Sequence, residues 1–142
     1  RWPTMRVPAA LRESVLLRDN YRCAYCLTSQ ENSGQRLQID HIIPRAHGGM
    51  TTLDNLCACC ASCNSHKAAR LFGLDPASDN AVQLFHPGQQ AWRDHFAWDE
   101  NGTLIIGLST VGRATIAALE MNNDTIVWAR RRWVEAGWHP PS

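Results

Sequence analysis

The chain has 142 residues, a formal net charge of +1 and an apolar fraction of 44%. This length suits one domain with room for a small additional unit. The near-neutral charge lacks the strong basic excess that marks many nucleic-acid-binding proteins. The apolar runs are too short to cross a bilayer, and no secretory signal pattern is visible, so we expect no membrane partner.

The N-terminal half predicts a helix, a strand and a second helix. Leu11 and Val15 recur at helical spacing in "PAALRESVLLRDN". The alternating, β-branched stretch "RLQIDHIIP" predicts a strand that ends at or before Pro44. After a Gly-Gly loop, "CASCNSHKAARLF" predicts a helix over about residues 60–71, because no helix breaker precedes Gly73.

Turn-forming residues cluster in "GLDPASDN", and we predict a domain boundary there. Residues 1–76 would form a core that includes the N-terminal helix. Residues 77–142 would form an α+β extension packed on that core.

This extension contains three predicted elements. Residues 96–98 and 104–108 flank a turn and predict a β-hairpin. A helix follows, capped by Ser109 or Thr110, and a last helix ends near Gly137.

Six cysteines occur at metal-ligand spacing, in "YRCAYC" and "LCACCASC". A CxxC turn brings two thiolates onto one ion, and two such turns complete a tetrahedral structural zinc site. Cys23 and Cys26 form one pair. The second pair is either Cys57 and Cys60 or Cys60 and Cys63. This spacing favours a metal in a reduced, cytoplasmic protein over a disulfide scaffold.

The residue after the second pair decides between the two alternatives. If Cys60 and Cys63 bind, Asn64 follows on the helix and can reach back to the strand. If Cys57 and Cys60 bind, Ala61 follows and can do no chemistry. We therefore predict a zinc site made of four cysteines: Cys23, Cys26, Cys60 and Cys63. The other two cysteines are expected to be small buried apolar residues: Cys57 and Cys59.

The ordered set of CxxC, "DHIIP", a Gly-Gly loop, "DNL" and CxxCN, with a lysine three residues later, resembles the HNH endonuclease family. The similarity covers about residues 21–71. It implies an α+β fold with a ββα-metal (His-Me finger) core. Many members carry histidine where this chain has Asn64, but the asparagine variant also occurs in the family, notably in phage Holliday-junction resolvases of this fold.

The resemblance implies hydrolysis of DNA phosphodiester bonds that leaves 5′-phosphate ends. His41 would be the general base that activates water, and Asn55 would orient it by hydrogen-bonding across the loop. Asp40 and Asn64 would hold one Mg²⁺ or Mn²⁺, because carboxylate and amide oxygens suit hard cations. Flanking phosphates would be contacted by four residues: Lys67, Arg45, Arg70 and His66.

Asp40 and His41 are neighbours on the predicted strand, where successive side chains point to opposite faces. Both can act on one phosphate only if the strand is distorted there, or if the phosphate is held from two sides.

The C-terminal segment places Trp128 and Trp133 on either side of residues 130–132, which are all arginine. We interpret this segment as core packing rather than a nucleic-acid surface, because Leu119, Ile126 and Trp133 recur every seven residues. The three arginines would then lie on the solvated face.

Two other functions stay open. A catalytically inactive, zinc-stabilised nucleic-acid-binding module would lack the base or a metal ligand, and here all the candidate residues are present. A zinc adaptor that binds protein would ignore nucleic acid and expose an apolar patch. DNA, double-stranded or branched, is the expected partner, and a homodimer would pair two sites for cutting both strands.

Overall fold

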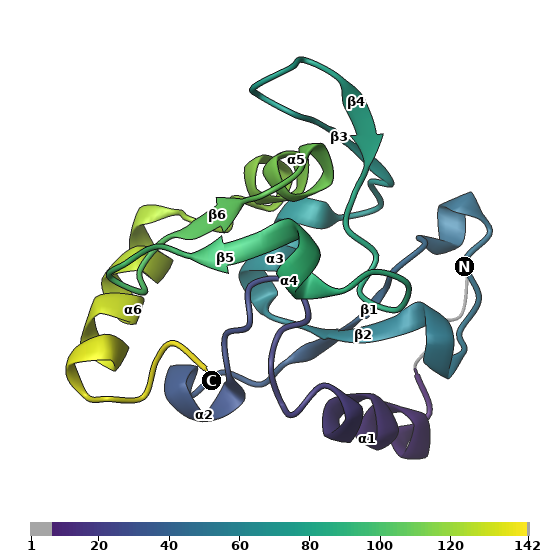
Figure 1. The fold of residues 1–142 in the computed structure, drawn as a ribbon. Helices are drawn as coiled ribbons and strands as arrows, with labels where there is room; N and C mark the ends of the chain where they lie inside the picture. Colours follow the sequence, from purple (N-terminus) through teal and green to yellow (C-terminus); the bar gives the residue numbers. More distant parts are fainter. Residues whose placement is uncertain (1–6, 142) are drawn as a thin grey trace.

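Residues 7–141, which the computed structural model describes, form an α+β arrangement of six α-helices and three antiparallel strand pairs (Figure 1). The helices are α1 (Ala9–Arg18), α2 (Gln30–Ser33), α3 (Ala61–Lys67), α4 (Trp92–His95), α5 (Thr110–Leu119) and α6 (Asp124–Glu135). The strand pairs are β1 (Gln38–His41) with β2 (Leu56–Cys59), β3 (Phe72–Leu74) with β4 (Ala81–Gln83), and β5 (Phe96–Trp98) with β6 (Ile105–Gly107). The predicted α+β class is confirmed.

Strands β1 and β2 and helix α3 form the predicted ββα unit. The strands pair antiparallel, with Asp40 opposite Cys57 and His41 opposite Leu56. Every residue of β2 is buried. Helix α1 packs against β2, and α3 packs against β1 and α5 (Figure 1). The loop between the strands carries two short 3-10 helices, η1 (Arg45–His47) and η2 (Leu53–Asn55).

Helix α3 is shorter than the sequence predicted. The chain leaves the helix at Ala68, whose φ is +49°. Strand β3 then pairs with β4, so the segment "GLDPASDN" contains the end of β3 and the turn of a hairpin. The prediction of a helix over residues 60–71 was wrong beyond Lys67, because strand pairing prevailed over the local helix propensity.

The turn of this hairpin is tied to helix α5 by a buried carboxylate. Arg113 Nε and Nη2 lie 2.9 and 3.0 Å from the two oxygens of Asp75. The pKa of Asp75 is held well below its ordinary value, first by Arg113 and then by the hydroxyl of Ser78. One cluster of buried apolar side chains also contains residues from both sides of the predicted boundary. The division into residues 1–76 and 77–142 stays a prediction.

The C-terminal hairpin and both following helices form where they were predicted. Ser109 Oγ caps α5 by accepting a hydrogen bond from Gly112 N at 3.0 Å. Asn123 Oδ1 caps α6 in the same way, with Ile126 N at 3.0 Å. Gly137, with φ at +80°, follows the end of α6. No helix within residues 7–141 has the length and apolar character to span a bilayer.

Helix α6 directs Trp133 into the core, as predicted, but it also buries one arginine. Arg131 and Arg132 are exposed, whereas Arg130 is 0% exposed. The expectation that all three arginines face solvent was therefore wrong for Arg130. The guanidinium is held inside because it donates to backbone carbonyl oxygens, including that of Thr103 at 2.9 Å.

Candidate functional site

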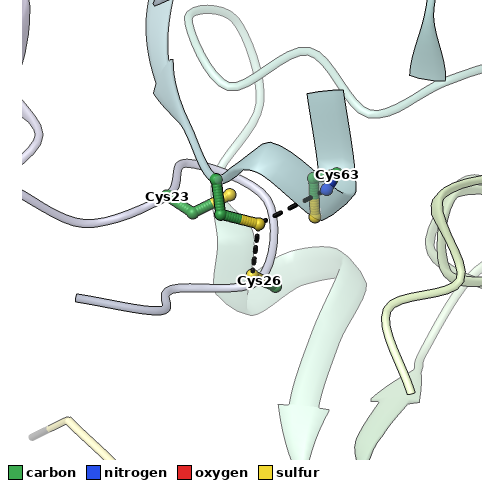
Figure 2. Close-up of side chains that lie close together, drawn as sticks. Cys23, Cys26 and Cys63 are labelled. Carbon is green, nitrogen blue, oxygen red and sulfur yellow. Dashed lines mark hydrogen bonds between the residues drawn. The ribbon is translucent and has the colours of Figure 1, made fainter. Parts of the chain in front are cut away.

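Four cysteine side chains from two CxxC turns gather in one place: Cys23, Cys26, Cys60 and Cys63. Their Sγ atoms all lie within 4.8 Å of one another. Figure 2 shows the side chains of Cys23, Cys26 and Cys63 lying close together where the two turns meet. Within residues 7–141, no other group of three or more histidine, cysteine or acidic side chains gathers in this way. The cluster contains Cys60 and Cys63 and not Cys57, which supports the choice of the second pair, and their role as metal ligands stays a prediction.

The two cysteines outside this group occupy strand β2. Cys57 and Cys59 are both 0% exposed and belong to the main apolar core. Their predicted role as small buried residues agrees with this placement.

Backbone hydrogen bonds shape the first CxxC turn and attach it to the sheet. Cys23 N donates to Thr28 O at 2.8 Å, and Leu27 N donates back to Cys23 O at 2.9 Å. Ala24 N donates to Ala58 O at 2.8 Å, which joins the turn to β2. The first pair is thereby held against the strand that leads into the second.

The second pair is positioned by the start of helix α3. Cys60 is the N-cap of this helix, and its Sγ accepts a hydrogen bond from Cys63 N at 3.3 Å. Cys60 Sγ also lies 3.6 Å from Cys26 Sγ, across the two turns. Cys60 thus belongs to the cysteine cluster and also determines where helix α3 begins.

The burial of these thiols fits them to a soft divalent cation. Burial raises the pKa of Cys23, and the neighbouring thiols Cys23 and Cys26 raise the pKa of Cys63. The pKa of Cys26 is lowered, because Cys23, Cys60 and Cys63 all interact with its sulfur. The pocket therefore favours one thiolate by itself. Four thiolates require a bound cation, and a tetrahedral Cys₄ set is typical of structural zinc.

Asp40 lies at the end of β1 in a buried ion pair. Lys67 Nζ is 3.0 Å from Asp40 Oδ2 and 3.3 Å from Oδ1. Tyr25 donates its hydroxyl to the same carboxylate at 2.9 Å. The two charged side chains, Asp40 and Lys67, are 6% and 2% exposed. Burial raises the pKa of Asp40, and Lys67 opposes this rise.

His41 is held by the loop between the strands. Its Nε2 lies 2.8 Å from Thr51 Oγ1. Its pKa is lowered, mainly by partial burial and further by the charges of Arg45 and Lys67, while Asp40 opposes the shift. The imidazole is therefore largely neutral at neutral pH, as a general base requires.

Strand β1 is not distorted at Asp40 and His41, because its pairing register is regular at both residues. A phosphate held from two sides stays a prediction. Asp40 contacts Tyr25 and Lys67, whereas His41 contacts Thr51 in the loop. The two side chains thus have different surroundings, which agrees with the alternation of a regular strand.

Asn55 closes the loop that carries Thr51. Its Oδ1 accepts from Ile43 N at 2.9 Å, and its Nδ2 donates to Ile43 O at 3.1 Å and Met50 O at 2.9 Å. A Cβ on Gly49 would lie 1.7 Å from Ile43 O, so only glycine fits beside this bridge. Asn55 contacts the loop backbone rather than the imidazole of His41, which it can orient only through the loop.

Asn64 and Lys67 lie one turn apart on α3, and both reach strand β1. Asn64 Nδ2 donates to Gln38 Oε1, while Lys67 contacts Asp40. Gln38 and Asp40 alternate along β1 and so share one face. The structure therefore brings Asn64 to the same face of the strand as Asp40, through Gln38.

The residues predicted to contact phosphates lie in different surroundings. Arg45 is exposed in η1, within electrostatic range of His41. His66 Nε2 lies 2.8 Å from Glu120 Oε2, and Arg70 donates to Ala118 O. Lys67 is buried by its ion pair, as described above, and its predicted phosphate contact stays a prediction.

Three polar residues of this site were not predicted from the sequence: Tyr25, Gln38 and Thr51. Tyr25 lies inside the first CxxC turn, where its aromatic character alone gave no sign of a bond to Asp40. Thr51 follows Gly48 and Gly49 in the loop, and nothing in the sequence there indicates a functional role. Only the folded loop brings its hydroxyl to His41.

A ββα unit with a Cys₄ cluster is typical of a small metal-binding domain, and the comparison with protein-family models agrees. The HNH endonuclease family model matches residues 23–70, which span the two CxxC turns, β1, β2 and α3. The chain is thus similar to the HNH endonuclease family over residues 23–70, and the resemblance seen in the sequence is confirmed. No curated protein and no solved structure matches the chain significantly.

We predict that serine variants of Cys60 and Cys57 differ in their metal content, because only Cys60 belongs to the proposed zinc site. The variant Cys60→Ser should lose the bound metal and melt at a lower temperature, because three thiolates hold the ion less tightly. The matched variant Cys57→Ser, on the same segment, should keep about one zinc per chain. Mass spectrometry of the metal in desalted protein makes the comparison. Loss of zinc in Cys57→Ser together with retention in Cys60→Ser would contradict the assignment.

Proposed function

We propose that this chain is a metal-dependent DNA endonuclease that hydrolyses phosphodiester bonds and leaves 5′-phosphate ends. The observation that carries the proposal is the His41 imidazole, whose Nε2 lies 2.8 Å from Thr51 Oγ1 and whose pKa is lowered by partial burial, within the region that matches the HNH family. The coarser conclusion, a nuclease-type function, follows from the family match itself.

His41 is assigned the role of general base. Since Nε2 contacts Thr51, we assign Nδ1 as the nitrogen that takes a proton from water. The resulting hydroxide attacks phosphorus, the bond from phosphorus to the 3′-oxygen breaks, and the leaving 3′-oxygen takes a proton from solvent water. The products are a 3′-hydroxyl and a 5′-phosphate. Asn55 supports this step by fixing the loop that carries Thr51.

Asp40 and Asn64 are the proposed ligands of one Mg²⁺ or Mn²⁺. Their carboxylate and amide oxygens suit a hard cation. Asp40 already binds a positive group, the Lys67 ammonium at 3.0 Å, so its position stabilises positive charge. When bound, the ion would neutralise charge on the scissile phosphate and the leaving oxygen.

Zinc is the proposed occupant of the Cys₄ cluster, in a structural role. Thiolate ligands at tetrahedral spacing select zinc over the hard cation proposed for Asp40. Six free thiols also suit a reducing compartment, and we propose that the protein is cytoplasmic.

DNA is the proposed partner, and we assign its phosphates to basic residues around the site. Arg45 is the best placed, because it is exposed and acts electrostatically on His41. Arg70 and His66 would contact phosphates farther along α3. Lys67 would do so only after leaving Asp40.

One observation favours the alternative function, an inactive nucleic-acid-binding module. The carboxylate of Asp40 is 6% exposed, and a buried lysine neutralises it. If this pair does not open, Asp40 cannot take a catalytic ion. The experiment below separates the two functions.

The nuclease proposal predicts that supercoiled plasmid is cut in Mg²⁺ or Mn²⁺ and not in EDTA. The variant His41→Ala should cut at least about 100-fold more slowly, the usual contribution of a general base. The matched control His47→Ala removes an exposed histidine from the same loop and should cut at the wild-type rate. Nicked circles would indicate one site acting alone, and linear product would indicate paired sites.

Two outcomes of this assay would contradict the proposal. Cutting that survives His41→Ala would remove His41 as the base. An absence of cutting in every metal, on plasmid and on branched DNA, combined with a shift of DNA in a binding gel, would support the inactive module.

A second prediction concerns the positioning of His41. The variant Thr51→Val keeps the side-chain shape but removes the hydroxyl bond to Nε2, so plasmid cutting should slow about tenfold. The control Thr52→Val removes the neighbouring hydroxyl, which bonds to Asp54 instead, and should leave the rate unchanged. Equal rates for Thr51→Val and the wild type would show that Thr51 does not position the base.

A further inference from the structure

Arg130 is a fully buried charge without a carboxylate partner among the described residues. It is 0% exposed, and no ion pair within residues 7–141 includes it. Its guanidinium donates to Thr103 O at 2.9 Å, Met121 O at 2.7 Å and Asn122 Oδ1 at 3.1 Å. These acceptors are neutral. Burial of a charge with only neutral partners is costly, so a source of negative charge should lie nearby.

The remaining surroundings of the guanidinium provide no negatively charged partner either, among the described residues. Its Nε–H is buried and has no hydrogen-bond partner among the described residues. The guanidinium carbon lies 5.1 Å from the centre of the Trp98 ring, a cation–π contact that is weaker than an ion pair. The neighbouring His139 packs against the same ring and stays neutral, because burial and then Arg130 lower its pKa to about 4.

Met121 lies between Arg130 and the Cys₄ cluster in the network of contacts. Met121, whose carbonyl accepts from Arg130, is 1% exposed. It lines a cavity of about 20 Å³ together with Cys26, Cys60 and Cys63. A single loop residue therefore contacts the guanidinium through its backbone and borders the thiols.

Among the groups that raise the pKa of Arg130, the cysteines of the cluster act most strongly. Burial lowers the pKa of the guanidinium, and Cys26, Cys63 and Cys60 raise it again, in that order. Asp99 acts in the same direction but contributes less than each of these cysteines. Four thiolates outweigh the charge of one divalent ion, so the loaded cluster would carry net negative charge permanently.

We propose that Arg130 is the buried counter-charge of the Cys₄ metal centre and that it couples metal retention to the docking of helix α6. The inference rests on the proposed zinc site. It adds that a residue far along the chain, outside the region that matches the family model, sets how tightly the metal is held. Neutralisation of excess charge beside a metal centre tunes its affinity, as other outer contacts of metal ligands do.

The experiment measures zinc transfer from the purified full chain to a coloured chelator. The variant Arg130→Gln is neutral but can still donate hydrogen bonds, so it should release zinc roughly tenfold faster. Arg130→Lys keeps the charge and should release zinc more slowly than Arg130→Gln. The matched control Arg131→Gln removes an exposed charge from the same helix and should behave as the wild type.

The outcomes separate this inference from the zinc proposal itself. Wild-type protein without zinc would contradict the Cys₄ assignment, and the inference would fail with it. In a second outcome, the wild type contains zinc, and Arg130→Gln is folded by circular dichroism and retains zinc as well as the wild type does. This outcome would overturn the counter-charge role of Arg130 and leave the zinc site standing. Equally rapid zinc release from Arg130→Gln and Arg130→Lys, or failure of both variants to fold, would show that the shape of the guanidinium is required and not its charge. Either result would also overturn the counter-charge role of Arg130.

Discussion

Four thiol groups from two distant turns share one buried pocket, and their charge is the constraint on which the rest of this domain depends. Burial and mutual repulsion oppose the ionisation of all four, and a bound cation removes that opposition. A bound ion would link the first CxxC turn, which is attached to β2, to the start of α3. Because Cys60 caps α3, the same residue belongs to the proposed metal site and marks where that helix begins.

The start of α3 determines what the helix brings to strand β1. Asn64 and Lys67 follow Cys60 on this short helix and reach Gln38 and Asp40. On the other side of the site, Asn55 closes the loop whose Thr51 holds His41. His41 and Asp40 are neighbours on β1, but the loop contacts His41 whereas α3 contacts Asp40 and carries Asn64. Substitutions in the loop and in α3 therefore address the proposed base and the proposed ion ligands separately.

Local signals in the sequence predicted much of this arrangement. Cysteine spacing, together with the position of Asn64, predicted the four cysteines that cluster, and capping residues such as Ser109 located the C-terminal helices, because these rules depend on near neighbours along the chain. The features that the sequence did not reveal share one physical cause. The end of α3 was overridden by pairing of β3 with β4, and the burial of Lys67 and Arg130 depends on partners that are distant in sequence. From the sequence alone, a charged residue is predicted to lie at the surface, because the partners that would stabilise it in the interior are not yet known.

The most direct test of the central claim is X-ray absorption at the zinc edge, measured on the purified full chain. The account predicts zinc with four sulfur neighbours at about 2.3 Å. This result would show that the two CxxC turns are joined through one ion. Zinc with nitrogen or oxygen in place of one or more sulfurs, or a folded protein that contains no zinc, would contradict it.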